Sequence, residues 1–151
     1  MILLFKVLLV VQCLVTIFHD MLEIPGWTHR SQVLAAIGVK KFWAATAINS
    51  VFPLTAVAVV LFAGGSHSLF ARNYPFIYCS VAVLSMVGMW HIPYYFGTDE
   101  KTKHIYAVMY EGTKQVFPPR KDHPRPNLLH VYLHVLYITT FSISVALRLK
   151  A

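Results

Sequence analysis

Four apolar runs of nearly bilayer length dominate this chain of 151 residues, and they lie at Ile2–Leu22, Phe42–Ala63, Pro75–Phe96 and Asn127–Leu147. A transmembrane α-helix needs ~20 consecutive, mainly apolar residues to cross the hydrocarbon core of a bilayer. A water-soluble domain of this length would hardly carry four such runs, and too few residues remain for a second domain. The sequence therefore predicts an all-α, polytopic bundle of four transmembrane helices, with residues 1–151 forming a single integral membrane domain.

The segments between the runs are polar enough to lie at the membrane surface. In the first loop, "SQVLAAIGVKK" (31–41) predicts a short interfacial helix with Ser31 as its N-cap. In the third loop, "DEKTKHIYAVMYEG" predicts an amphipathic surface helix that ends at Gly112. The prolines of "FPPRKDHPRP" (117–126, here called the strap) exclude a helix and predict a stiff, extended segment that leads into the last run.

Basic residues are divided unevenly between the two ends of the predicted bundle. Nine Lys and Arg residues lie in the first and third loops, and four lie near the termini and in the second loop. An excess of Lys and Arg marks cytoplasmic loops. We therefore expect both termini outside the cytoplasm and loops one and three within it, in a cell inner membrane or an ER-type membrane.

The net charge of +7 does not indicate a nucleic-acid partner, because no basic stripe with interleaved aromatic residues lies on a soluble face. The expected partners are membrane lipid and a lipophilic small molecule. A homo-oligomer and a larger membrane complex are both compatible with a bundle of this size.

Polar residues also gather at one end of the bundle. All six acids and seven of the eight histidines, all but His67, lie at or near the end that carries loops one and three. Spacings of three and four residues place polar side chains on one face of a helix. The polar faces contain Gln12, Thr16, His19 and Glu23 in the first helix, Asn49 in the second, His91 and Tyr95 in the third, and His130, His134 and Tyr137 in the fourth. Ionisable groups inside a bilayer usually face the bundle interior, so these faces predict a shared polar cavity.

The first interpretation of this cavity is acid–base catalysis on a small lipophilic substrate of sterol, terpenoid or quinone type. His19 and Glu23 lie one helical turn apart and can share a proton, as general acid–base catalysis requires. The predicted catalytic residues are His19, Glu23, Asp20 and His91. The predicted substrate-binding residues are Asn49, Trp90, Tyr94, Tyr95, Tyr137 and Arg120, of which Arg120 would hold an anionic group. Such an enzyme of lipid metabolism would be an isomerase, a cyclase or an oxidoreductase.

Three alternatives use the same histidines differently. His130 and His134 form a helical two-ligand pair and predict a transition-metal site that assists the reaction. His91 is the preferred third ligand, and His19, Glu23 or Asp20 would also complete the site. Histidines on facing helices, such as His91 with His130 or His134, would instead ligate haem b in an electron-transfer protein. The third alternative has no cofactor and no chemistry, and the chain is then an accessory subunit of a membrane complex.

The stretch "FHDMLEIPGW" resembles the emopamil-binding, or EXPERA, family of membrane proteins, which includes sterol isomerases and ligand-binding relatives. The resemblance rests on His19-x-x-x-Glu23 at the end of the first helix, the aromatic Trp27, and the junctions "YYFGTDE" and "DHPRPN". It implies a four-helix membrane core with a cavity for a sterol-like lipophile, and His19 and Glu23 as the proton-handling pair. Asn49 and His91 stand where that family tends to carry acids, so the resemblance carries over only His19 and Glu23.

Overall fold

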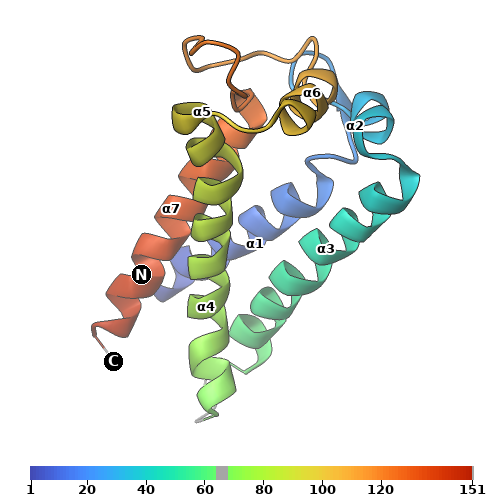
Figure 1. Ribbon diagram of the computed structural model, residues 1–151. Coiled ribbons are helices and arrows are strands. Elements are labelled where there is room, and N and C mark those ends of the chain that lie inside the picture. The colour runs from blue at the N-terminus through green and yellow to red at the C-terminus, as the bar shows by residue number, and fades with distance from the viewer. Residues whose placement is uncertain (64–67, 151) are drawn as a thin grey trace.

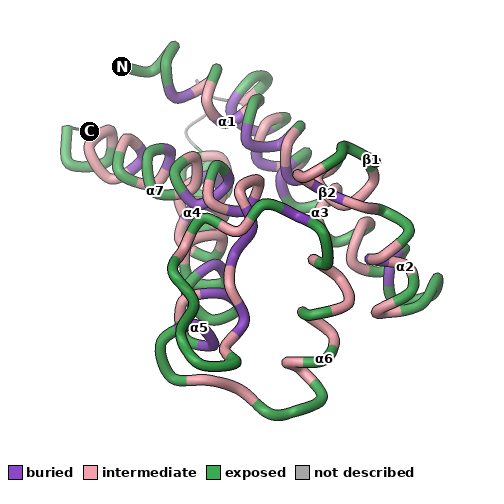
Figure 2. Tube along the Cα trace, turned by 90° about the horizontal axis from the view of Figure 1, so that it is seen from above, coloured by how far each residue is buried: buried purple, intermediate pink, exposed green. Residues whose placement is uncertain are grey.

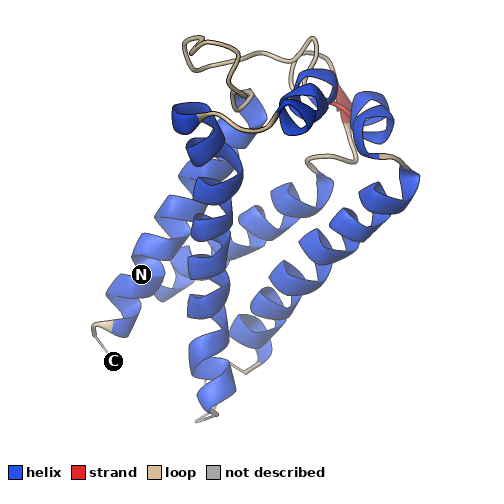
Figure 3. Cartoon of the chain, in the orientation of Figure 1, coloured by secondary structure: helices blue, strands red, loops and turns tan. Residues whose placement is uncertain are grey.

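The computed structural model describes residues 1–63 and 68–150, and most of them are helical (Figure 1). The elements in chain order are α1 (Ile2–Phe18), β1 (Glu23–Ile24), β2 (Thr28–His29), α2 (Arg30–Ile37), α3 (Val39–Phe62), α4 (Leu69–Met86), the π-helical turn η1 (Val87–His91), α5 (Ile92–Phe96), α6 (Glu100–Met109) and α7 (Leu128–Arg148). The two strands have two residues each and pair as an antiparallel hairpin (Figure 3). A mainly helical, membrane-type bundle is therefore confirmed.

Three stretches are long and apolar enough to cross a membrane, namely α3, the continuous segment Leu69–Phe96 and α7. The fourth apolar helix, α1, is shorter, with 17 residues. It ends at Phe18, one turn before the predicted end, because the chain turns at His19 and then enters the hairpin. The bounds of α7 agree with the prediction to within one residue.

The starts of two other helices also differ from the prediction. α3 begins at Val39, directly after Gly38, whose φ of 80° ends α2. α4 begins at Leu69, so Pro75 lies inside this helix and does not start it. The predicted turn between α3 and α4 includes His67, which lies outside the described residues.

The four apolar helices form a ring. α1 packs against α3 and α7, and α4 packs against the same two helices from the other side. The surface helices α2 and α6 lie together at one end of the ring, where the strap also lies, whereas α1 starts and α7 ends at the opposite end (Figure 1). The first and third loops therefore share one end, which brings their polar residues together.

Burial divides the helices into an inner and an outer face (Figure 2). The core between α1, α3 and α4 consists of Phe5, Leu9, Ala56, Val60 and Cys79. The outward faces are also apolar and include the exposed side chains of Leu3, Val51, Leu54, Ile77, Leu84 and Val135. A large apolar outer surface is unfavourable in water, and contact with lipid hydrocarbon removes this cost.

Two irregularities interrupt the long helices. Pro53 lies inside α3, where it removes one backbone hydrogen bond of the helix. η1 inserts a π-helical turn between α4 and α5. Such a turn holds one more residue than an α-helical turn and is frequent at functional sites. It sets the directions in which Trp90 and His91 leave the helix.

The predicted surface helices are present as α2 and α6. α2 begins at Arg30 with His29 as its N-cap, so the prediction of Ser31 as the cap is wrong, and Lys40 and Lys41 belong to α3 because Gly38 ends α2. Asp99 is the N-cap of α6 and accepts a hydrogen bond from the backbone N–H of Thr102 (3.0 Å). α6 ends at Met109, one turn before the predicted end at Gly112. The strap between α6 and α7 contains no helix, as its prolines predict. It is not extended throughout, because the His123 N–H donates to the Arg120 carbonyl (3.1 Å) and closes a turn in which Lys121 has a φ of 51°.

Backbone hydrogen bonds join the two long loops into one cap over the ring. The Lys114 N–H donates to the Gly26 carbonyl (2.7 Å), and the Leu128 N–H donates to the Lys114 carbonyl (2.8 Å). The strap is held from below, because the hydroxyl of Tyr94 donates to the carbonyl of Pro118 (3.2 Å). The cap thus fixes the first turn of α7 relative to the end of α1.

Candidate functional site

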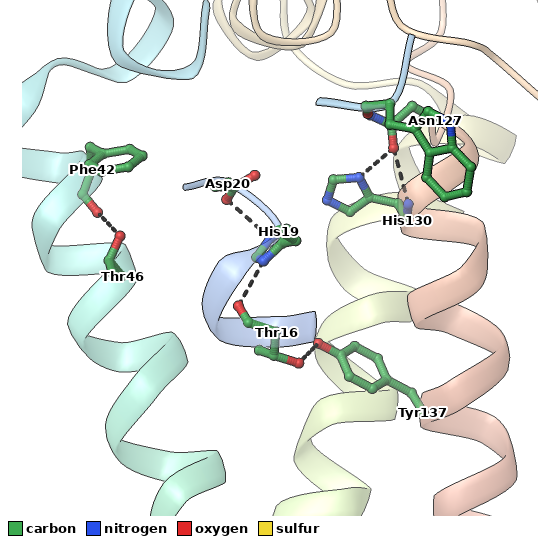
Figure 4. Close-up of polar contacts among 9 residues, drawn as sticks. Thr16, His19, Asp20, Phe42, Thr46, Asn127, His130 and Tyr137 are labelled. Atoms are coloured by element: carbon green, nitrogen blue, oxygen red, sulfur yellow. Dashed lines mark hydrogen bonds and ion pairs between the residues drawn. The ribbon is translucent and has the colours of Figure 1, made fainter. Parts of the chain in front are cut away.

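Two histidines and one aspartate meet where α1 ends and α7 begins. His19 and Asp20 directly follow α1, and His130 lies in the first turn of α7. One potential ligand atom from each residue lies within 4.8 Å of the other two, and this is the one such group found among the described residues. Figure 4 shows the side chains of His19 and Asp20 facing the ring of His130. We call these three residues the His–Asp–His cluster.

The cluster is largely buried. The side chains of His19 and Asp20 are 9% and 23% exposed, and His130 is 6% exposed. Buried polar groups need partners, because an unpaired one loses its hydration without compensation. The partners of each ring nitrogen therefore reveal what the cluster can hold.

His19 is flanked by acceptors on both ring nitrogens. Nδ1 lies 2.7 Å from the carbonyl oxygen of Thr16, which belongs to the last turn of α1. A carbonyl only accepts, so Nδ1 carries a proton. Nε2 lies 3.0 Å from Oδ2 of Asp20. Because a carboxylate also only accepts, this contact is a hydrogen bond in which Nε2 carries the proton. A metal ion bound by both residues would take the place of that proton.

His130 is oriented by the N-cap of its own helix. Oδ1 of Asn127 accepts from the backbone N–H of His130 (3.0 Å) and from its Nδ1 (2.7 Å). Nδ2 of Asn127 donates to the carbonyl of Trp27 (2.9 Å), and this bond fixes which end of the amide is the oxygen. Nδ1 of His130 is therefore the donor, and the lone pair is on Nε2. In Figure 4 this second nitrogen points toward Asp20 and His19.

An aromatic shell, formed by Trp90, Tyr106 and Tyr110, covers His130. The ring centroids of Trp90 and Tyr110 lie 4.3 and 5.2 Å from that of His130. Those of Tyr106 and Tyr110 lie 5.0 and 5.1 Å from that of Trp90. Burial raises the pKa of Tyr106 to about 12 and that of Tyr110 well above its ordinary value. Both phenols are therefore neutral at neutral pH, and the shell adds no charge beside the cluster.

Polar contacts continue below the cluster into the ring. The hydroxyls of Thr16 and Tyr137 lie 3.1 Å apart and join α1 to α7 (Figure 4). One turn deeper, Nε2 of Gln12 donates to the hydroxyl of Tyr78 (3.1 Å) and joins α1 to α4. These contacts hold the end of α1 at a fixed distance from α7.

A second pair of histidines, His91 and His134, lies next to Trp90. The ring centroids of His91 and His134 are 5.1 Å apart, and that of His134 is 6.2 Å from Trp90. Nε2 of the buried His134 has no hydrogen-bond partner among the residues that the structure describes. His134, predicted as a metal ligand together with His91 and His130, thus lies apart from the group formed by His130 with His19 and Asp20.

Glu23 lies away from the cluster, although the sequence predicts it as the partner of His19. Its carboxylate accepts from the backbone N–H and the hydroxyl of Ser31 (3.2 and 3.0 Å) and lies 3.4 Å from Nδ1 of His29. The Ser31 N–H, with the hydroxyl and the imidazole, lowers the pKa of Glu23. Because α1 ends at Phe18, His19 and Glu23 do not lie on one helical face despite their spacing of four residues. Asp20, and not Glu23, is the carboxylate next to His19.

The predicted substrate-binding residues divide into two groups. Trp90 and Tyr137 adjoin the cluster through the contacts above. Tyr94, Tyr95 and Arg120 lie at the strap, where the guanidinium of Arg120 sits 5.5 Å from the ring centroid of Tyr95. Asn49 is half-buried on α3, and no hydrogen bond joins it to the cluster among the described residues.

Asn127, Tyr106 and Tyr110 were not predicted as site residues. A signal for Asn127 exists in the sequence, since an asparagine three residues before a histidine, at the start of an apolar helix, is the spacing of an N-cap. Tyr106 and Tyr110 lie on a surface helix, and their contact with Trp90 depends on how the cap is folded.

No protein-family model, curated protein or solved structure matches this chain. The resemblance to the emopamil-binding family therefore stays a prediction, and the functional argument depends on the geometry of the cluster.

Proposed function

We propose that this protein is a membrane-embedded enzyme that acts on a small lipophilic substrate with a divalent transition-metal ion held by the His–Asp–His cluster. In this proposal all four apolar helices cross the bilayer, and the loops that carry α2 and α6 are cytoplasmic, as the distribution of Lys and Arg favours. The termini then lie on the other side of the membrane.

The observation that carries the proposal is the way in which both imidazoles are oriented. Metal-ligating histidines almost always donate their other ring N–H to a carbonyl or a carboxylate, which fixes the tautomer. His19 does so with Thr16, and His130 does so with Asn127. Both Nε2 atoms are thereby left as ligands beside the carboxylate of Asp20. Two histidines and one carboxylate form the ligand set of many non-haem Fe(II) sites and of some catalytic zinc sites, which keep further positions open.

The surroundings of the cluster favour chemistry on a lipophilic molecule. A bound ion of this kind supplies a Lewis acid with an open coordination position. The aromatic shell covers His130 and excludes water from that side, while the neutral hydroxyl groups of Thr16 and Tyr137 lie below. A substrate dissolved in the bilayer reaches this depth between apolar helices without first entering water.

A second candidate function is favoured by the 3.0 Å contact between Nε2 of His19 and Oδ2 of Asp20. The same contact suits an imidazolium–carboxylate pair that transfers protons without a metal ion. This is the predicted acid–base pair with Asp20 in place of Glu23, and it suits the sterol-isomerase resemblance. The two candidates differ in metal content.

The first test is therefore the metal content of the purified protein. After expression in metal-supplemented medium and purification in neutral detergent, we expect about one divalent ion per chain by elemental analysis, because three protein ligands are already oriented. H104A, which removes an exposed histidine of α6, is the matched control and should keep the ion. Protein free of iron, zinc, manganese and copper would support the proton-transfer candidate, and a Soret band would support haem.

The second test separates Asp20 from Glu23. We expect E23Q to keep the metal content of the wild type, because the Glu23 carboxylate is exposed and bonded to Ser31 and His29. Elemental analysis and far-UV circular dichroism of E23Q measure this directly. Loss of the ion in E23Q with an intact fold would show that Glu23 acts at the cluster, as the sequence pattern suggested.

A further inference from the structure

A cavity of about 400 Å³ lies between α6 and the strap, and we call it the α6–strap cavity. Tyr106 and Tyr110 of α6 form part of its wall, and Lys121 and Arg125 of the strap line it from the other side. Its volume is at the lower end of the range for small-molecule sites, which is enough for a charged head with a few carbon atoms.

The lining of this cavity carries an excess of positive charge. Lys103 also lines it, but its ammonium is paired with the carboxylates of Glu100 and Asp122. Lys121 and Arg125 have no carboxylate within ion-pair distance among the described residues. One guanidinium nitrogen of Arg125 donates to the carbonyl of Phe117 (3.4 Å), which holds the group while other N–H donors stay free.

The cavity adjoins the His–Asp–His cluster through one shared wall. Tyr110 lines the cavity, and its ring also lies edge-on to His130 with centroids 5.2 Å apart. The Tyr110 side chain therefore lies between the cavity and the cluster. A molecule with an anionic head in the cavity would place the start of its apolar part against Tyr106 and Tyr110, which belong to the aromatic shell over His130.

We propose that the α6–strap cavity binds the anionic head, a phosphate or a carboxylate, of an amphiphilic substrate whose apolar part reaches the cluster. This inference rests on the proposed function and names the substrate class for it. Lys121 and Arg125 take the role that was predicted for Arg120, which lies over Tyr95 and is not among the residues that line the cavity. Arginine and lysine suit this role because charge-assisted hydrogen bonds to phosphate and carboxylate are the stronger ones.

The test compares three probes on chelator-treated protein in neutral detergent by isothermal titration calorimetry. Octyl phosphate carries both parts, octyl glucoside has the same tail with a neutral head, and inorganic phosphate has no tail. We expect octyl phosphate to bind at least ~10-fold more tightly than either of the others, since a charge-assisted contact of this kind is worth a factor of ten or more. Equally tight binding of inorganic phosphate would contradict the proposal of an amphiphilic substrate and would show that the cavity binds free anions.

Two double variants localise the binding. K121Q/R125Q should lose at least ~10-fold in affinity for octyl phosphate with no change for octyl glucoside. K101Q/K114Q removes the same formal charge from two exposed lysines outside the cavity and should bind octyl phosphate as the wild type does. An equal loss in both variants would overturn the site, because the preference would then come from the overall charge of this surface.

A crossed comparison separates this inference from the proposed function. H19A/H130A, which lacks two proposed metal ligands, should still prefer octyl phosphate. K121Q/R125Q should still hold its metal ion. Wild-type protein that is purified without a metal ion, before any chelator is added, and that prefers octyl phosphate would contradict only the metal proposal. Wild-type protein that is purified with its metal ion but lacks this preference would contradict only the proposed anionic head.

Discussion

D20N is expected to lower the affinity for a divalent transition-metal ion at least ~100-fold, because a change in an outer partner of a metal ligand already costs about 10–100-fold and Asp20 would be a ligand itself. The substitution keeps the size of the side chain and removes the one carboxylate of the cluster. H130A should cause a loss of the same order, since it removes the ligand from α7. Titration of metal-free protein with Zn²⁺ or Fe²⁺, in competition with a chelator of known affinity, measures both effects.

E23Q is the matched control for D20N, because it removes a carboxylate three residues away that is bonded elsewhere. Far-UV circular dichroism and size-exclusion chromatography show whether each variant is folded. Wild-type affinity in folded D20N and H130A would rule out the cluster as the metal site. An equal loss in E23Q would show that the effect does not depend on direct ligation.

N127A should have the second-largest effect, because one side chain serves three hydrogen-bonding groups at a fully buried position. Loss of an N-cap together with unpaired buried groups should lower the free energy of unfolding by about 2–4 kcal/mol. The ring of His130 also loses the acceptor for Nδ1, so metal affinity should fall by about 10–100-fold. Denaturant unfolding in mixed micelles and the chelator competition measure the two effects separately.

N127D distinguishes orientation of the ligand from stability alone. It keeps the oxygen that accepts from the backbone N–H and Nδ1 of His130, and it loses the donor to Trp27. We therefore expect N127D to be less stable than the wild type but to keep most of the metal affinity that N127A loses. Equal metal affinities in N127A and the wild type would show that Asn127 only caps α7.

The start of α7 could be predicted closely, because local sequence signals mark it. Pro126 cannot continue an earlier helix, and Asn127 caps the next one. The end of α1 has no comparable signal, because apolar Met21 and Leu22 continue the hydrophobic run beyond His19 and Asp20. The turn there is closed by hydrogen bonds from the Met21 and Leu22 N–H groups to the Phe18 carbonyl, and β1, which follows it, pairs with β2. The spacing of residues along one helix does not contain these contacts.

The members of the cluster could be predicted individually but not as a group. His19 and Asp20 were expected as catalytic residues with Glu23, and His130 as a metal ligand with His134 and His91. His19 and Asp20 were considered at that metal site only as alternatives to His91. Helical spacing places side chains on a face, but it does not say which helices are neighbours. The contact of α1 with α7 brings His130 to His19 and Asp20, while the π-helical turn directs His91 toward His134.

The shortness of α1 has a consequence for the lipid around it. Its 17 residues span ~26 Å along the helix axis, less than the ~30 Å of a typical hydrocarbon core. In the proposed orientation this hydrophobic mismatch draws the leaflet inward beside His19, at a modest energetic cost per ångström of thinning. Beside α1, the glycerol and phosphate groups of phospholipids then lie at the level of the cluster. The longer spans keep the bilayer at its full thickness around the rest of the protein.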